Sequence, residues 1–171
     1  MRVLVWVSRT TWRACVDAAA RMVHDGSAAE VTLLHVPEPD APEAAHAAFT
    51  GLLGRRRHAD PAPVITAEAR VAGERLLAEA AGRLGSPCAT LMPEGRPERA
   101  VVSAAAGADL LIAGRDGDTT RLGPHSLRPP LRFVLDHAPC QVLLVWPGEA
   151  PGTHTIPPPP APGDRPPRPP G

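Results

Sequence analysis

The chain of 171 residues contains no lysine, no asparagine and no tyrosine, so all 18 of its basic residues are arginines. Without lysine it can form neither a Walker-type phosphate-binding loop nor a Schiff base with a carbonyl substrate. The arginines are balanced by 18 acidic residues, which gives a formal net charge of zero. Nucleic-acid-binding domains normally carry a basic excess, and this balance therefore argues against that class.

Cysteine is scarce and long apolar runs are missing. Cys15, Cys88 and Cys140 lie far apart without a C-x-x-C pair, which is typical of small apolar core residues in a reducing compartment. No stretch approaches the roughly 20 apolar residues of a membrane-spanning helix, and the apolar run at the N-terminus is too short for a signal peptide. We therefore expect a cytoplasmic protein that engages neither a membrane nor nucleic acid.

What the sequence does contain is a regular alternation of short apolar runs and helical patterns. The apolar runs, which predict buried strands, lie at residues 3–7, 31–36, 89–92, 110–113 and 141–146. Helical patterns lie at residues 12–23, 41–53, 66–84, 97–106 and 131–137. This order predicts an α/β fold, an open five-stranded parallel sheet with helices on both faces, of the Rossmann-like kind. Ligands bind such sheets at the carboxyl ends of the strands where the strand order reverses, which we expect to be the loops after Val7 and Ala113.

Proline is concentrated after Trp146, where large apolar residues are almost absent. Such a segment buries too little surface to offset the entropy of ordering it. We therefore expect a folded domain over residues 1–147 and a disordered proline-rich tail over 148–171, with polyproline II character at Pro157–Pro160. A docking site for a proline-binding partner and an inert tail are both open interpretations, and the composition favours the inert one.

Four segments together resemble the universal stress protein family: VLVWVSRTTW, VTLLHV, EGRPERAVVSAAAGADLLIAGRDG and HAPCQVLLVW. The resemblance covers residues 1–147. It implies a sheet of the adenine nucleotide alpha-hydrolase-like type, with an ATP site at the switch point in many members. It also implies a homodimer formed through the last strand, here Cys140–Trp146.

The family's ATP-binding members carry a G-x2-G-x9-G-[ST] pattern after the fourth strand, and only its first half is matched, by Gly114 and Gly117. Glycines there allow backbone N–H groups to approach phosphate oxygens. Arg128 and its neighbours replace the final Gly-Ser pair. Ser8 stands where the first strand often ends in a nucleotide-contacting aspartate, and Val36 keeps the adenine-facing valine. The resemblance thus implies a degenerate nucleotide site at Val7, Ser8, Val36, Ala113, Gly114, Asp116, Gly117 and Arg128.

Other candidate residues give no pattern of catalysis or metal binding. His35, at the end of an apolar strand, is typical of a packed, hydrogen-bonded histidine. Asp109, Asp116 and Asp118 cluster near the glycine loop, residues 114–127, and could hold Mg²⁺ beside a nucleotide. The simpler interpretation places Asp109 at the opposite edge of the sheet and makes the other two turn residues. Arg115, Arg121 and Arg128 are open to two interpretations, as ligands of an anion or as solvated loop residues.

The sequence therefore predicts a non-catalytic regulatory or binding protein of the stress response with a degenerate adenine-nucleotide site. The alternative is an ATP-binding switch or slow ATPase that uses the same glycine loop. A third interpretation, a relative of electron-transfer flavoproteins, has no redox or ligase motif to support it. No catalytic and no metal-ligating residues are expected.

Overall fold

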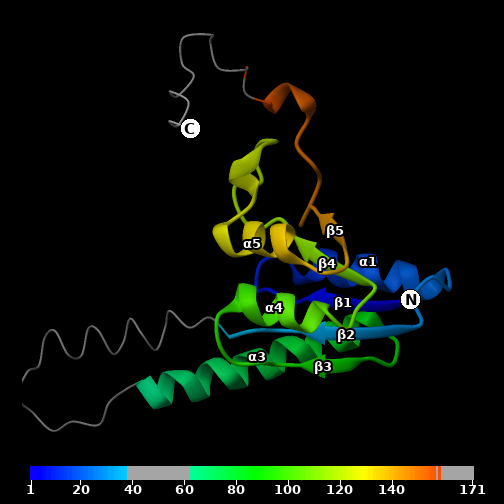
Figure 1. Cartoon of the computed structure of the whole chain (residues 1–171), viewed down its shortest axis with the longest axis vertical. Helices are drawn as coiled ribbons and strands as arrows, with labels where there is room; N and C mark the ends of the chain where they lie inside the picture. Colours follow the sequence, from blue (N-terminus) through cyan, green and yellow to red (C-terminus); the bar gives the residue numbers. More distant parts are fainter. Residues whose placement is uncertain (38–61, 157, 159–171) are drawn as a thin grey trace, which may run out of the picture.

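The computed structural model describes residues 1–37, 62–156 and 158, and it shows a five-stranded sheet in the order β3-β2-β1-β4-β5 (Figure 1). Every strand pairing is parallel, which confirms the predicted fold class. At the centre of the sheet Val5 pairs with Leu33 on one side and with Ile112 on the other. The strands are β1 (Arg2–Trp6), β2 (Glu30–Leu34), β3 (Ala89–Leu91), β4 (Leu110–Gly114) and β5 (Gln141–Val145).

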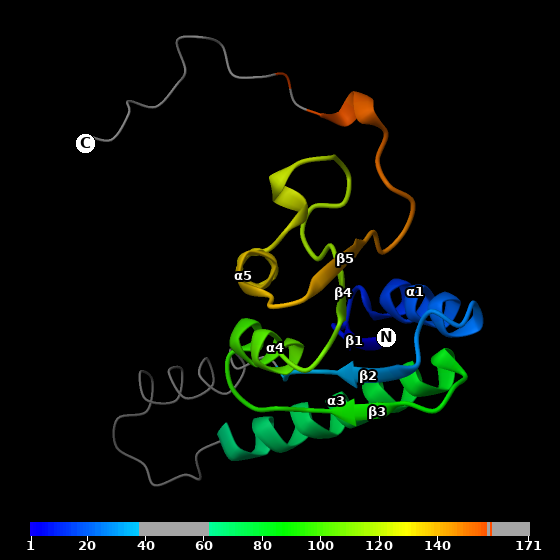
Figure 2. The ribbon, with the colours of Figure 1, turned by 45° about the vertical axis from the view of Figure 1, so that its right-hand side comes forward.

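Helices cover both faces of the sheet (Figure 2). One face packs against α1 and α3, and the other packs against α4 and α5. The predicted helix at residues 41–53 lies outside the described residues. The helices are α1 (Trp12–His24), α3 (Ala62–Leu84), α4 (Pro97–Ala105) and α5 (Pro129–His137), with 3-10 turns η1 (Pro124–Ser126) and η2 (Thr153–Thr155).

The sheet is buried on both faces, which explains why its strands appear in the sequence as continuous apolar runs rather than alternating ones. Val3 and Val5 point into the cluster formed with α1 and α3, whereas Leu4 points into the cluster formed with α4 and α5. Leu33, Leu111 and Ile112 have no exposed surface at all. Burying a side chain of this size contributes roughly 1.5–3 kcal/mol, so these central strands supply much of the stability.

Two helix starts differ from the sequence expectation. Helix α5 begins at Pro129 rather than at residue 131, because Pro129 and Pro130 occupy the first turn. Proline is accommodated there, since the first N–H groups of a helix have no partner within it. Helix α3 begins at Ala62 instead of residue 66.

The structure describes the start of the proline-rich segment, residues 148–156, for which the sequence predicts disorder. Residues 153–155 form the turn η2, and Thr155 Oγ1 accepts a hydrogen bond of 3.0 Å from the backbone N–H of Leu122. A threonine of this segment thus supplies a partner to an N–H group of the glycine loop. Most of the remaining tail, including three residues of Pro157–Pro160, lies outside the described residues.

The three cysteines are free and lie at different depths. Cys15 in α1 is completely buried, and this burial raises the pKa of its thiol to about 12. Burial also raises the pKa of Cys88 and Cys140, which are partly exposed. Among the described residues, no helix has the length and apolar character needed to cross a membrane.

Candidate functional site

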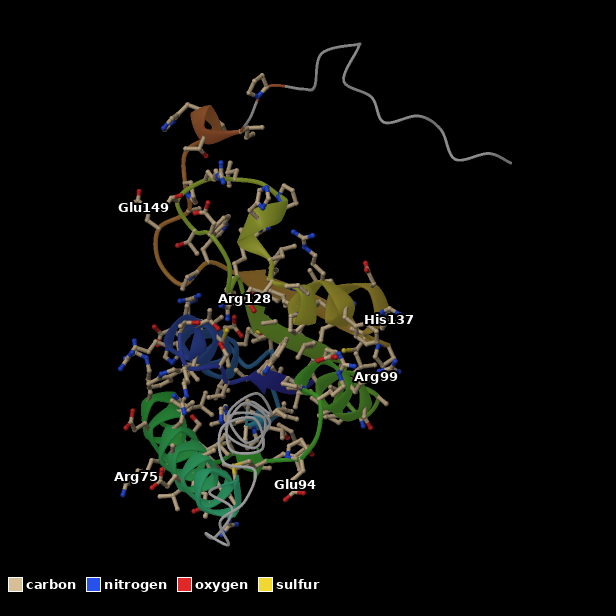
Figure 3. All side chains as sticks on the ribbon, turned by 90° about the vertical axis from the view of Figure 1, so that its left-hand side faces the viewer. Arg75, Glu94, Arg99, Arg128, His137 and Glu149 are labelled. Carbon is tan, nitrogen blue, oxygen red and sulfur yellow. The ribbon has the colours of Figure 1, made fainter. Side chains whose placement is uncertain are left out.

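A cleft of about 750 Å³ opens at the carboxyl ends of β1 and β2. It lies beside the point where the strand order reverses, since β1 has β2 on one side and β4 on the other. In Figure 3, which looks onto this edge of the sheet, Arg128 lies near the middle while Arg75 and Glu94 lie at the periphery. The floor comes from the ends of β1 and β2, and the rim comes from the starts of α4 and α5. Its lining residues include Trp6, Val7, Ser8, Arg9, His35, Val36, Arg96, Glu98, Asp116, Arg128, Pro129, Pro130 and Phe133.

The structure brings together five of the eight residues that the sequence assigned to the site: Val7, Ser8, Val36, Asp116 and Arg128. Val7 and Val36 are buried at the ends of adjacent strands and contribute apolar floor. The other three, Ala113, Gly114 and Gly117, do not line the cleft.

Gly114 and Gly117 are needed for close packing within the protein. A Cβ atom at Gly114 would lie 2.4 Å from the Cβ atom of Thr11, at the start of α1. At Gly117 it would lie 2.2 Å from the carbonyl oxygen of His125. The N–H of Gly117 already donates a 3.1 Å hydrogen bond to the carbonyl of Ser126. The glycine loop is therefore closed on itself, and this N–H is not free to approach a phosphate.

Asp116 does more than the turn-forming role that the sequence suggests. Its Oδ1 accepts a hydrogen bond of 2.9 Å from the backbone N–H of Arg128, immediately before α5. Burial raises the pKa of the Asp116 carboxyl, whereas the hydrogen bonds from backbone N–H groups and the charge of Arg128 act in the opposite direction. A carboxylate thus lies at the N-terminus of α5, where the helix dipole stabilises negative charge.

Three arginines line the cleft: Arg9, Arg96 and Arg128. Arg96 Nε forms an ion pair of 2.8 Å with Oε1 of Glu98, whose side chain is largely buried. Sequence reasoning missed Arg9 and Arg96, although each lies next to a strand end or a helix start. That neighbourhood is the available signal, because these are the positions that face the crevice of a parallel sheet.

The other two arginines of the glycine loop lie elsewhere. Arg115 donates a hydrogen bond to Ser126 Oγ, and its guanidinium group lies 4.5 Å from the centre of the Trp146 ring. Arg121 forms an ion pair of 2.9 Å with Asp118. Arg115 therefore links the loop to the end of β5, Arg121 pairs within the loop, and neither side chain lines the cleft.

His35 and two aromatic residues shape the apolar part of the cleft. His35 is 7% exposed, and its Nδ1 donates a 2.8 Å hydrogen bond to the carbonyl of Val7, which confirms the packed interpretation. Trp6 and Phe133 are lining residues that sequence reasoning missed. Phe133 is stacked on His137, with 4.0 Å between the ring centroids.

The remaining aspartates behave as expected. Asp109 precedes β4, at the amino end of the sheet, and its Oδ2 accepts a 2.7 Å hydrogen bond from the N–H of Arg2. Asp118 accepts hydrogen bonds from the N–H and hydroxyl of Thr120, as a turn residue does. In the part of the chain that the structure describes, no three histidine, cysteine, aspartate or glutamate side chains gather as metal ligands.

The start of α5 and the glycine loop offer few donors to the phosphate chain of ATP, which the resemblance implies as a ligand. Pro129 and Pro130 have no N–H to donate, the N–H of Gly117 is taken within the loop, and that of Arg128 is taken by Asp116. The carboxylate of Asp116 would also repel an incoming phosphate. What the cleft retains is an apolar floor with arginines at its rim.

Comparison with solved structures shows the same fold in several universal stress proteins. One, described as in complex with cAMP, is 22% identical, with a TM-score of 0.55, over 86% of this chain and 98% of that one. The protein UspA from Lactobacillus plantarum is 20% identical, with a TM-score of 0.54, over 85% and 97% of the two chains. A family member from Burkholderia pseudomallei is 22% identical, with a TM-score of 0.54, over 84% and 94%.

A search of curated protein sequences gives no match. The model of the universal stress protein family matches residues 1–145. That match spans all five strands and all the residues that line the cleft. The chain therefore belongs to the universal stress protein family.

Proposed function

We propose that this protein is a non-catalytic regulatory protein of the stress response that binds an adenine nucleoside or a nucleoside with a single phosphate. One observation carries the proposal: the cleft at the switch point keeps its apolar floor, while most backbone donors of the glycine loop and the α5 start that would hold a phosphate chain are used or absent. Its volume, about 750 Å³, lies within the range typical of small-molecule sites.

The composition of the cleft supports a nucleoside as the ligand. Trp6, Val7 and Val36 offer apolar surface for a base, and Ser8 adds a hydroxyl beside them. Arg9 supplies positive charge that suits a single anionic group, whereas the charge of Arg96 is matched by Glu98. A universal stress protein of the same fold is described in complex with cAMP, a cyclic nucleotide with one phosphate.

The acidic residues of the cleft support a binding role over a hydrolytic one. A general base must be free to take a proton from an attacking water molecule. The acidic lining residues are Asp116 and Glu98, and each is engaged, Asp116 with the N–H of Arg128 and Glu98 with Arg96.

Calorimetric titration of adenosine, cAMP and ATP, with and without Mg²⁺, tests the proposal. Adenosine and cAMP are expected to bind, and ATP is expected to bind about tenfold more weakly or worse, because its extra charges meet Asp116. No phosphate release from ATP is expected in the same samples. ATP binding tighter than that of adenosine, together with formation of ADP, would instead establish the ATP-dependent switch or slow ATPase.

We also propose that the protein forms a homodimer through β5, as the family resemblance implies for Cys140–Trp146. Strand β5 lies at the edge of the sheet, and its side chains from Val142 to Val145 are only half-buried. An unpaired edge with apolar side chains is a template for pairing with a second chain.

Light scattering on two matched variants tests the dimer. Leu144→Glu in β5 is expected to halve the mass observed at micromolar concentration, because it places a charge at the proposed interface. Leu91→Glu, on the opposite edge strand β3, is expected to leave the mass unchanged, since Leu91 is 43% exposed and lies outside that interface. A monomeric wild-type protein, or equal effects of the two changes, would refute pairing through β5.

A further inference from the structure

The start of α5 contains an anion supplied by the protein itself. The carboxylate of Asp116 accepts the N–H of Arg128 at 2.9 Å and lines the cleft. Asp116 reaches this position because the glycine loop folds back, with the N–H of Asp118 bonded to the carbonyl of His125 at 2.9 Å. The loop therefore delivers the carboxylate to the place where the helix dipole stabilises negative charge.

Little remains at this helix start for a second anion to bind. The first four N–H groups of an α-helix lack partners within it and are the usual donors to a bound phosphate. Here the first two helical positions are Pro129 and Pro130, which have no N–H. That leaves the N–H of Leu131 as the remaining donor at this helix start, because the N–H of Arg132 already bonds to the carbonyl of Arg128 at 3.1 Å.

The other acidic residue of the cleft does not act in the same way. Glu98 is held against Arg96 at 2.8 Å, so that its charge is matched by a guanidinium group. The Arg128 guanidinium acts on Asp116 through its charge without forming an ion pair with it, and the hydrogen-bonded partner of the carboxylate is the neutral backbone N–H of Arg128. The negative charge of Asp116 is thus matched less directly than that of Glu98, and it lies on the side of the cleft where α5 begins.

We propose that Asp116 is a specificity-determining residue: its carboxylate occupies the anion position at the start of α5 and excludes di- and triphosphates from the cleft. The ligands selected are a nucleoside without charge, or one with a single phosphate that points toward Arg9. This inference rests on the proposed function, because it assumes that a nucleoside occupies the floor of the cleft.

The test is calorimetric titration of ATP and adenosine into full-length Asp116→Asn protein. The amide oxygen still accepts the N–H of Arg128, so the helix start is kept and only the charge is removed. ATP affinity is expected to rise by about tenfold or more, since like charges in close contact are strongly unfavourable, while adenosine affinity stays the same. Asp118→Asn is the matched control, because Asp118 lies on the same loop but does not line the cleft; its ATP affinity is expected to equal that of the wild type.

The variant is expected to fold. An acid whose pKa is raised in the native state binds its proton more tightly there than in the unfolded chain. Ionisation of Asp116 therefore lowers stability above its native pKa, and loss of the carboxyl is expected not to lower the melting temperature at neutral pH. As pH falls through the unfolded pKa, any advantage of the variant disappears.

Asp116→Ala gives a second variant that removes the charge together with the hydrogen-bond acceptor, and the same gain in ATP affinity is expected.

The titrations separate failure of the Asp116 specificity role from failure of the proposed nucleoside-binding function. Unchanged ATP affinity in Asp116→Asn and Asp116→Ala, with adenosine still bound, would overturn the specificity role and leave the nucleoside site standing. An equal gain in Asp118→Asn would overturn it too, because overall charge and not position would then be the cause. A wild-type protein that binds neither adenosine nor cAMP would overturn the proposed function itself.

Discussion

Replacement of Gly117 by alanine is expected to lower the free energy of unfolding by roughly 1–3 kcal/mol, the usual cost of forcing an extra group into a packed site. The new Cβ would lie 2.2 Å from the carbonyl oxygen of His125 and 2.8 Å from the carbonyl carbon of Ser126. Both neighbours are backbone atoms, so no side-chain rotation can relieve the contact. Urea denaturation followed by circular dichroism measures the loss.

Gly82→Ala is the matched control for this change. Gly82 lies inside helix α3, and a Cβ there would meet no atom within 4 Å. Alanine favours the helical conformation over glycine by about 1 kcal/mol, so this variant is expected to be more stable than the wild type. If Gly117→Ala were as stable as the wild type, the glycine loop would not be closed against residues 125–127.

Leu111→Ala is expected to have the largest effect on stability, a loss of roughly 2–5 kcal/mol. Leu111 has no exposed surface and lies in β4, paired with Leu4 on one side and Val142 on the other. Truncating it opens a cavity in the middle of the cluster beneath α4 and α5, where the rigid sheet limits collapse. The midpoint of urea denaturation is the measurement.

Leu91→Ala provides the comparison at an exposed position. Leu91 is 43% exposed at the end of the edge strand β3, so the same truncation is expected to change stability by only about 0.5 kcal/mol. Similar losses in the two variants would show that the cluster around Leu111 is not the core of the fold.

The fold was predictable because its strands are buried on both faces. Apolar runs such as residues 110–113 leave few alternatives to a strand between two helix layers, and the helical runs between them require parallel pairing. Val7, Ser8 and Val36 reach the cleft for the same reason, since carboxyl ends of parallel strands meet at one edge. Helix starts were harder to predict, because Pro129 and Pro130 resemble a loop in sequence but form the first turn of α5.

The detailed site was less predictable because it depends on contacts between distant segments. Spacing identified Gly117, but what fills the space of its missing side chain is the backbone at residues 125–127. Arg115 and Arg128 look equivalent in the loop, yet one stacks on Trp146 and the other lines the cleft. Asp116 becomes a helix-capping anion only after the loop has closed, so its sequence neighbours reveal only a turn.

The burial of Cys15 also makes its thiol a reporter of how often the folded domain opens. A thiol with a pKa of about 12 is almost never a thiolate at neutral pH, and complete burial keeps reagents away from it. Alkylation of Cys15 must therefore wait for α1 to leave the sheet, whereas Cys88 and Cys140 are partly accessible in the native state. The modification rate at this single sulfur thus counts opening events of the folded chain.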